Sequence, residues 1–287
     1  MKPVPVSVGI PTFGRGLRLV QTLEHLWACD PPPAQVIVHV DQSDGELDRE
    51  LAARFPSIRI LSSVGNVGPG GGRHRCLQAA TQPFFASFDD DSWPVDRDFF
   101  AEVVTVFERH PRVAVLAATI QFLREVQSER VAEVKTITDY TGCGYAIRVE
   151  AYRQTAGHID RACAYGVEEV DLSMQLHALE WRILECRSLR VFHDTQLSHH
   201  SRADVVACMV QNIALRAFLR YPVWLWPRAI LQIGNIVLDM IRRRRFAGLC
   251  AGLCGIPATL IHYASQRRQL PAAKIRSFLN ARPRLTS

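Results

Sequence analysis

The chain has 287 residues, of which 48% are hydrophobic and 22% are charged. This composition fits one large α/β domain, or one domain with a small appendage, and excludes an intrinsically disordered chain. The net charge of +6 suits phosphate-bearing ligands or an anionic membrane surface. The basic excess is too small and too scattered to indicate a nucleic-acid partner.

The cysteines and the N-terminal segment bear on the cellular compartment. Eight cysteines occur without a C-x-x-C pair, which argues against a zinc knuckle. Several lie in apolar segments, so we expect reduced core thiols in a cytoplasmic protein rather than disulfides. The N-terminal segment enters a predicted strand without an apolar leader, so no signal peptide is expected.

The first half of the chain alternates short apolar runs with segments of helical spacing. Strands are predicted at residues 4–10, 35–40, 58–61, 83–88 and 113–118, and helices at 17–27, 46–55, 70–80 and 99–109. Apolar strands separated by helices are typical of a parallel sheet that helices cover on both faces. We therefore predict an α/β fold with a mostly parallel, Rossmann-like sheet.

Beyond residue 119 the pattern is less regular. It predicts strands at 143–149, 182–185 and 189–192 and a helix at 168–180, and we divide the chain into a domain of residues 1–203 and a helical region of residues 204–287. The apolar segment 221–241 contains prolines and polar residues, which makes it a poor membrane-spanning helix. Four arginines at 242–245 follow it, so a membrane-interfacial helix and a helical cap on the catalytic domain are equally consistent.

Polar segments follow four of the predicted strands. They are PTFGR at 11–15, DQSD at 41–44, NVGPGGGR at 66–73 and DDD at 89–91. Ligands of open α/β sheets bind outside the carboxyl ends of the strands. The joint placement of these segments on one rim predicts a ligand site there.

The triplet Asp89, Asp90 and Asp91 predicts a metal site. Adjacent carboxylates repel one another, and magnesium or manganese would offset this cost while also binding substrate phosphates. In an extended segment Asp89 and Asp91 point one way and Asp90 the other. Asp91 is then the direct ligand and Asp89 its helper through water or ribose. The alternative is a solvated turn that caps the following helix.

Three further groups on the rim allow two interpretations each. Asp41 can accept a hydrogen bond from a nucleobase or ribose, or it can form an Asx turn. The glycine-rich stretch after Asn66 can bring backbone to a phosphate at a helix N-terminus, or it can form a tight turn, since it lacks the P-loop and dinucleotide patterns. Arg73 can neutralise phosphate or be solvated.

Glu168, Glu169 and Asp171 fall at a predicted helix start. Acids are favoured there by the helix dipole, but one of them can also serve as a general base that takes a proton from an acceptor hydroxyl. The pair His199 and His200 can add an imidazole to the metal or pyrophosphate, or can lie in the core or on the surface.

Taken together, these segments resemble the family 2 glycosyltransferases, which have the GT-A fold. The matching pieces are PTFGR, VIVHVDQSDG, NVGPGGGRHR, FFASFDDDS, GCGYAIR, YGVEEVDLSMQL and LSHHS, in the family's order between residues 4 and 201. The resemblance implies a metal-dependent inverting enzyme that uses Mn or Mg and a nucleotide-diphosphate sugar donor. It further implies a glycan or lipid-linked acceptor and a role in bacterial surface polysaccharide synthesis. The N-terminal segment and the cysteines predict a cytoplasmic location, and the C-terminal region allows peripheral contact with the inner face of the cell membrane. A nucleotidyltransferase and a non-catalytic sugar-nucleotide-binding protein are the alternatives.

The resemblance also implies roles for individual residues. The donor nucleotide would be held by Pro11, Thr12, Arg15, Asp41, Asn66, Gly71, Arg73, Asp89 and Asp90; the metal by Asp91, Asp89 and His199; and the acceptor side would be formed by Gly142, Cys143, Gly144 and Asp171. Glu169 falls on the position of the catalytic base, where the family usually has aspartate, and Glu168 or Asp171 is the fallback. The segment 41–44 differs from the sequence that is commonest in the family, so the resemblance does not specify the nucleobase of the donor.

Overall fold

The computed structural model describes residues 2–122, 129–163, 167–195 and 202–282. They form two compact units. Unit 1 comprises Met1–Ala162 and Glu180–Thr195, and unit 2 comprises Cys163–Leu179 and Gln196–Ser287. The sequence-based division after residue 203 assigns residues 163–179 to the first domain, whereas in the structure they group with the C-terminal helices.

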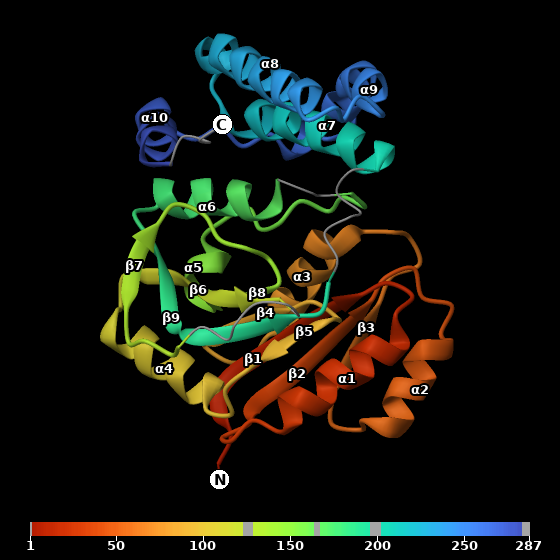
Figure 1. Cartoon of the computed structure of the whole chain (residues 1–287), viewed down its shortest axis with the longest axis vertical. Coiled ribbons are helices and arrows are strands. Elements are labelled where there is room, and N and C mark those ends of the chain that lie inside the picture. The colour runs from red at the N-terminus through yellow and green to blue at the C-terminus, as the bar shows by residue number, and fades with distance from the viewer. Residues whose placement is uncertain (1, 123–128, 164–166, 196–201, 283–287) are drawn as a thin grey trace. The chain divides into compact units, whose positions relative to one another are not determined.

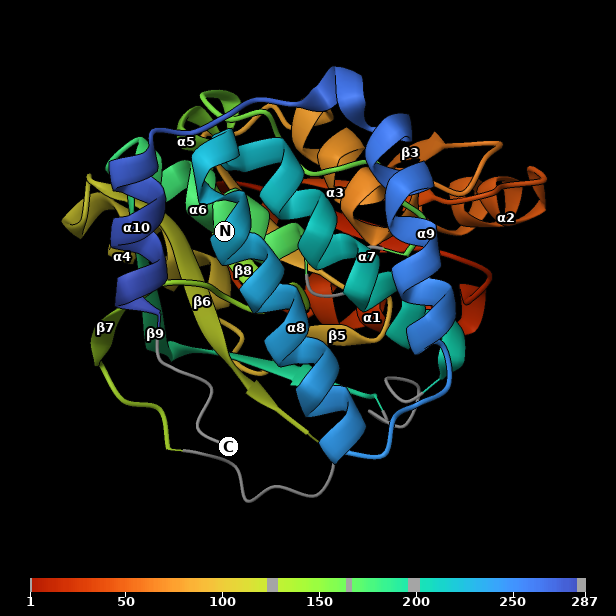
Figure 2. The ribbon, with the colours of Figure 1, turned by 90° about the horizontal axis from the view of Figure 1, so that it is seen from above.

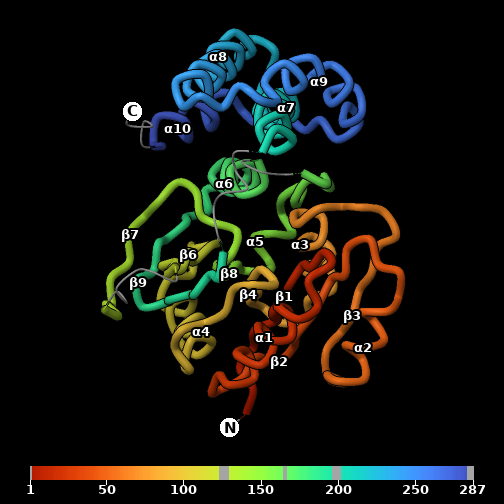
Figure 3. The backbone as a smooth tube through the Cα atoms, turned by 45° about the vertical axis from the view of Figure 1, so that its right-hand side comes forward, coloured from red at the N-terminus to blue at the C-terminus, as the bar shows by residue number. Residues whose placement is uncertain are grey.

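Unit 1 is built on one sheet, to which the described residues contribute nine strands. They are β1 (Val4–Thr12), β2 (Pro33–Val40), β3 (Arg59–Ser62), β4 (Phe84–Phe88), β5 (Ser92–Pro94), β6 (Val113–Gln121), β7 (Val134–Ile137), β8 (Gly144–Arg148) and β9 (Arg182–His193). The order is β3-β2-β1-β4-β8-β6-β9-β5, with β7 beside β9 (Figures 1 and 3). The pairs among β3, β2, β1 and β4 are parallel, and β8 runs antiparallel to both its neighbours. The pair of β6 with β9 is also parallel, whereas β5 and β7 run antiparallel to β9. The predicted α/β fold is confirmed, with a mixed sheet that is all parallel from β3 to β4.

Helices cover both faces of this sheet. They are α1 (Gly16–Trp27), α2 (Glu46–Arg54), α3 (Gly68–Ala79), α4 (Phe99–Arg109) and α5 (Val149–Arg153). Alternation along β1 explains the two layers, since Val6, Val8 and Ile10 enter the core beneath α1, α2 and α4. Gly9 points to the opposite face, where an added Cβ would touch Cys76 of α3. Because β1 runs parallel to β2 and β4, the carboxyl ends of these three strands lie on the same rim of the sheet.

The structure corrects the prediction for residues 182–192. Instead of two short strands, they form the single strand β9. Its pairing with β6 shifts between Cys186 and Arg190, so the intervening residues form a β-bulge. The apparent gap in the sequence pattern is this bulge. The strands β5 and β7 were not predicted, because they are too short to show an alternating pattern.

Unit 2 is helical in the described residues. It comprises α6 (Glu168–Ala178), α7 (Ala203–Arg220), the short 3-10 helix η2 (Val223–Leu225), α8 (Trp226–Arg242), α9 (Leu249–His262), η3 (Ala264–Gln266) and α10 (Ala272–Ala281). Met174, Tyr221 and Phe278 join α6, α7 and α10 in one apolar cluster. Val210, Met240 and Leu249 join α7, α8 and α9 in another. In the part of the chain that the structure describes, no helix combines the length and hydropathy needed to cross a membrane.

Candidate active site

The acidic triplet lies at the carboxyl end of β4 and forms a turn. The amide of Ser92 donates to the carbonyl of Asp89 at 3.2 Å, which closes the turn, and β5 starts at Ser92. The extended geometry expected from the sequence does not apply, because Asp90 and Asp91 lie within this turn. The three carboxylates therefore point to three different sets of partners, and Asp90 does not face away from the site.

Asp90 is buried and ties the turn to β1 and α1. Its carboxylate accepts hydrogen bonds from Thr12 Oγ1 at 2.7 Å and Arg15 Nη1 at 3.3 Å, and its carbonyl accepts one from Thr22. Burial raises the pKa of Asp90 to about 6, although Thr12 and Arg15 favour the charged form. Asp90 thus holds together residues from the ends of β1 and β4.

Asp91 is the most heavily paired member of the triplet. One carboxylate oxygen accepts from Arg15 at 3.0 Å and from Arg18 at 3.3 Å, and the other lies 3.1 Å from Nε2 of His193. Burial acts to raise the pKa of Asp91, but His193 and the two arginines outweigh it and hold the pKa below its ordinary value. Asp91 is therefore a carboxylate at neutral pH, and it faces the guanidinium groups of Arg15 and Arg18 and the imidazole of His193 in β9.

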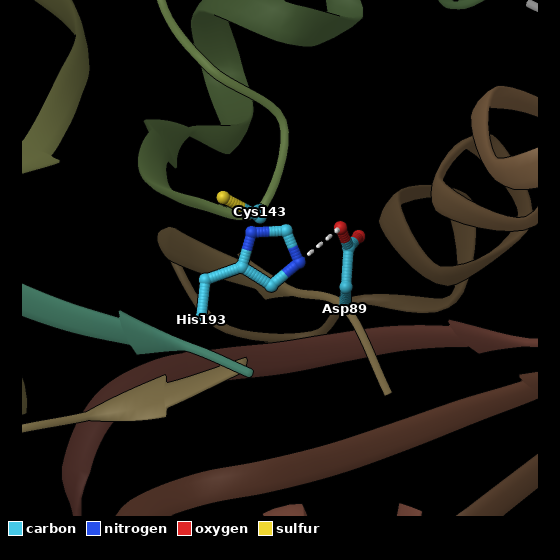
Figure 4. A group of neighbouring side chains, drawn as sticks. All are labelled: Asp89, Cys143 and His193. Carbon is cyan, nitrogen blue, oxygen red and sulfur yellow. Dashed lines mark ion pairs between the residues drawn. The ribbon is translucent and has the colours of Figure 1, made fainter. Parts of the chain in front are cut away.

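Asp89 pairs with the buried guanidinium of Arg73, which also donates to Ser87 Oγ. The other oxygen of Asp89 lies 3.9 Å from Nε2 of His193. Figure 4 shows this imidazole between Asp89 and Cys143. Ligand atoms of Asp89, Cys143 and His193 all lie within 4.8 Å of one another, so three side chains from different segments converge on one point.

This group of side chains fits a divalent cation. A carboxylate suits Mg²⁺ or Mn²⁺, and an imidazole is a common ligand of transition metals. Asp91 lies beside this group, because its carboxylate contacts Nε2 of His193. The thiol of Cys143 is a softer donor, which adds affinity for metals such as zinc. Ser92 fixes the Cys143 segment, since its hydroxyl donates to the Cys143 carbonyl at 2.7 Å. Gly142 and Gly144 lie on either side of Cys143 and are buried.

Asp41 and the glycine-rich stretch form a second part of the rim. The Asp41 carboxylate accepts from the amides of Val67 and Gly68 and from Ser63 Oγ, at 2.8–3.2 Å. Asn66 also accepts from the Gly68 amide, as in an Asx turn. In the structure, Asp41 therefore anchors the start of α3.

Close packing explains two of the glycines. Gly68 has φ +70°, and a Cβ there would lie 2.0 Å from the Arg161 carbonyl oxygen. A Cβ on Gly71 would lie 2.5 Å from Asp160 Oδ1. Both positions therefore need glycine for packing within unit 1. Pro11 directly precedes Thr12 in β1 and lies opposite His39 in the pairing of β1 with β2.

The remaining predicted residues lie in unit 2 or outside the described residues. Glu168, Glu169 and Asp171 form the acidic first turn of α6, as predicted. Asp171 is buried and paired with Arg220 of α7, whose Nε and Nη2 each donate at 2.7 Å. This contact gives Asp171 a place in the core of unit 2. His199 lies outside the described residues, so its role as a metal ligand stays a prediction.

The sequence interpretation did not include His193 or Arg18. His193 directly follows the predicted strand 189–192, and this position was the only available signal. It reaches the triplet because β5 and β9 pair with Ser92 opposite His193. Arg18 lies one helical turn from Arg15, so both guanidinium groups reach Asp91 from the same face of α1.

Comparison with known proteins identifies a family and a fold. The sequence profile described as Glycosyl transferase family 2 matches residues 7–165, more than half of the chain. No curated protein matches the sequence.

Several solved structures share the fold. GalNAc-T7, crystallised with UDP, GalNAc and Mn2+, matches with a TM-score of 0.58 and 14% identity over 73% of this chain and 47% of its own. The mannosyltransferase PcManGT from Pyrobaculum calidifontis, in complex with GDP-Man and Mn2+, has a TM-score of 0.57 and 15% identity over 98% of this chain and 82% of its own. S. aureus TarS 1-349 with UDP-GlcNAc has a TM-score of 0.53 and 15% identity over 72% and 66%. The chain thus spans about half the length of GalNAc-T7, and at these identities the matches establish the GT-A fold.

Proposed function

Since the chain belongs to glycosyltransferase family 2, we propose that it moves a sugar, with inversion, from a nucleotide-diphosphate donor to a hydroxyl of a glycan or lipid-linked acceptor. We place the reaction in bacterial surface polysaccharide synthesis, at the inner face of the cell membrane. The observation that carries the proposal is the convergence of Asp89, Asp91 and His193 opposite three arginines at the rim of the sheet.

The arginines and carboxylates provide a binding site for a diphosphate. Arg15 and Arg18 have half-exposed side chains, and Arg73 is buried behind Asp89. Guanidinium groups donate hydrogen bonds to phosphate oxygens in a fixed planar geometry, so Arg15 and Arg18 are suited to the donor diphosphate. We assign Thr12, Asp41 and Asn66 to positioning the nucleotide side, directly or through the loops that they hold.

Asp89, Asp91 and His193 would hold a divalent metal, Mn or Mg, with His199 as a further predicted ligand. When bound, the metal supplies positive charge that stabilises the leaving diphosphate. The solved structures of GalNAc-T7 and PcManGT contain Mn2+, which supports this assignment. The protein's own contribution is to hold Asp91 ionised through Arg15 and Arg18 and to fix Asp89 through its ion pair with Arg73.

Glu169 is assigned as the general base. Its carboxylate would take the proton of the acceptor hydroxyl while the acceptor oxygen forms a bond to the anomeric carbon. The bond from that carbon to the diphosphate oxygen breaks, and its electron pair stays on the diphosphate. Arg15 and Arg18 donate hydrogen bonds to this leaving group. The acidic first turn of α6 supplies Glu168 as the neighbouring alternative.

The test is a transfer assay of the full chain with manganese and a panel of nucleotide sugars. Glu169→Gln should retain donor binding in calorimetry but lose transfer by a factor of about 10² to 10⁴, the range of general-base catalysis. Glu168→Gln shows whether the neighbouring acid carries the role, and Glu150→Gln is the matched control, since Glu150 is an exposed acid of α5.

Three outcomes would contradict the proposal. Undiminished transfer by Glu169→Gln would remove this residue from the base role. Release of pyrophosphate from a nucleoside triphosphate and a sugar phosphate would identify a nucleotidyltransferase instead. Binding of donors without transfer or hydrolysis across the panel would identify a sugar-nucleotide-binding protein.

A further inference from the structure

The helix α8 has three distinct sides. Ala229 and Met240 are buried, and Met240 packs with Val206 and Val210 of α7. A polar side carries Arg228, Gln232, Asn235 and Asp239, which recur at helical spacing. The third side is apolar although it is exposed, so α8 is more than a helix packed by one face onto its neighbours.

The outer apolar side consists of Trp226, Ile230, Leu231, Leu238 and Ile241, and it is preceded by Trp224 in η2. Ile230 is 68% exposed, Leu231 69% and Trp224 69%. Single exposed apolar residues are ordinary, but a stripe of them along the length of one helix marks an interaction surface. We call this set, Trp224 included, the α8 apolar face.

Basic residues lie at one end of this face. Arg242, Arg243 and Arg244 at the end of α8 are exposed. From residue 203 to the end, the sequence contains 13 Lys and Arg against two Asp, a net charge of +11, so residues 1–202 carry −5 of the total of +6. The positive charge of the chain is thus concentrated in the part that bears the apolar face.

The helix α9 shares this character. It contains no Lys, Arg, Asp or Glu, and it exposes Leu253 and Ile261. Both α8 and α9 pack on α7 (Figure 2). The apolar surface of unit 2 therefore extends beyond a single helix.

We propose that the α8 apolar face is a docking surface for an anionic lipid bilayer. Tryptophan and aliphatic side chains on one side of a helix, with arginines at its margin, are the combination that lies in the interface between headgroups and acyl chains. The absence of a membrane-crossing helix among the described residues fits a helix that lies on the bilayer. A second copy of the chain is disfavoured as the occupant, because it would bring two strongly basic surfaces together.

The first experiment measures sedimentation of the full chain with vesicles of phosphatidylcholine, with and without phosphatidylglycerol. The wild type should bind the vesicles that contain phosphatidylglycerol. Arg242→Gln/Arg244→Gln should weaken this binding roughly 30-fold, since each arginine near an anionic surface contributes about fivefold. Arg268→Gln/Arg276→Gln removes the same charge from exposed positions outside α8 and should have the smaller effect.

The second variant introduces charge into the apolar face itself. Ile230→Glu/Leu231→Glu should abolish vesicle binding, and its melting temperature should stay near that of the wild type because both side chains are exposed. The matched control, Leu17→Glu/Val64→Glu, adds the same charge at exposed apolar positions of unit 1 and should still bind. Equal binding by both double variants would overturn the proposal.

A third measurement locates the contact. Brominated lipids should quench the fluorescence of Trp224, so Trp224→Phe should lose most of the quenching and Trp27→Phe should keep it. No binding to phosphatidylglycerol vesicles, together with a dimer in light scattering that Ile230→Glu/Leu231→Glu dissociates, would identify a second copy as the occupant and overturn the proposal. These assays contain no nucleotide sugar, so their outcome is independent of the proposed transfer activity.

Discussion

The rim of the sheet in unit 1 and the outer side of α8 in unit 2 differ in how far their arginines are paired with acidic side chains. At the rim, Arg15, Arg18 and Arg73 are paired with the acidic triplet. On α8 and its C-terminal end, the described ion pairs include Arg243 with Asp239 and none for Arg242 or Arg244. Paired charges on a packed scaffold are preorganised for a ligand of defined geometry, whereas exposed charges beside apolar side chains suit an extended surface.

The largest effect is expected from Asp91→Asn. The amide cannot serve as an anionic metal ligand, and it leaves Arg15 and Arg18 without their shared partner, so kcat of transfer should fall by about 10³ or more. Steady-state transfer assays with manganese measure this. The control is Asp30→Asn, an exposed acid before β2.

The same variant separates the functions of the two regions. Asp91→Asn should bind anionic vesicles as the wild type does, because the α8 apolar face is unchanged. Ile230→Glu/Leu231→Glu should show the reverse, with transfer to a water-soluble acceptor retained. A single variant that removes both activities while remaining folded would break the distinction.

The next effect concerns the stability of unit 2. Arg220→Met leaves the buried Asp171 carboxylate without its guanidinium partner, which should lower the free energy of unfolding by about 3–5 kcal/mol. Chemical denaturation followed by circular dichroism measures it. Arg220→Met/Asp171→Leu replaces the whole pair with apolar groups and should recover most of the loss; no recovery would show that Arg220 acts through its other contacts.

A smaller effect is expected at the residue that the sequence did not reveal. His193→Gln removes an imidazole beside Asp89 and Asp91, so manganese affinity should fall by about 10- to 100-fold. Calorimetric titration with manganese measures it. Cys143→Ser should lower zinc affinity more than manganese affinity, because the thiolate is the softer ligand. Unchanged manganese binding in His193→Gln would leave His199 as the histidine ligand.

The sequence predicted the layers of unit 1 because their determinants are local. The runs that became β2 and β4 are mostly apolar, and α1 and α4 have clear helical spacing. The split of β9 was wrong because a β-bulge interrupts the pattern without ending the strand. Local pattern thus defines most elements, but not irregular pairing.

The site was predicted less completely because it depends on contacts between segments that are distant in the sequence. The triplet was identified from its charge, but its turn geometry depends on Ser92 and the start of β5. His193 lies 102 residues from Asp91 in sequence, and only the pairing of β5 with β9 brings it there. For α8, the sequence left an interfacial helix and a packed cap open, and in the structure one side packs while another is exposed.

The smallest predicted effect is a dependence of stability on pH that belongs to unit 1 alone. His158 is buried against Tyr145 and Tyr152, and burial, with Arg73 and His74 adding to it, lowers its pKa to about 3. The unfolded chain protonates this histidine below about pH 6.5, whereas the folded chain does not, so stability is lost as the pH falls through that value. At about pH 5 the cost is roughly 2 kcal/mol relative to neutral pH. His158→Gln removes this contribution, so its free energy of unfolding should fall less than that of the wild type between these two pH values. Equal slopes in urea titrations would show that His158 is protonated within the folded unit.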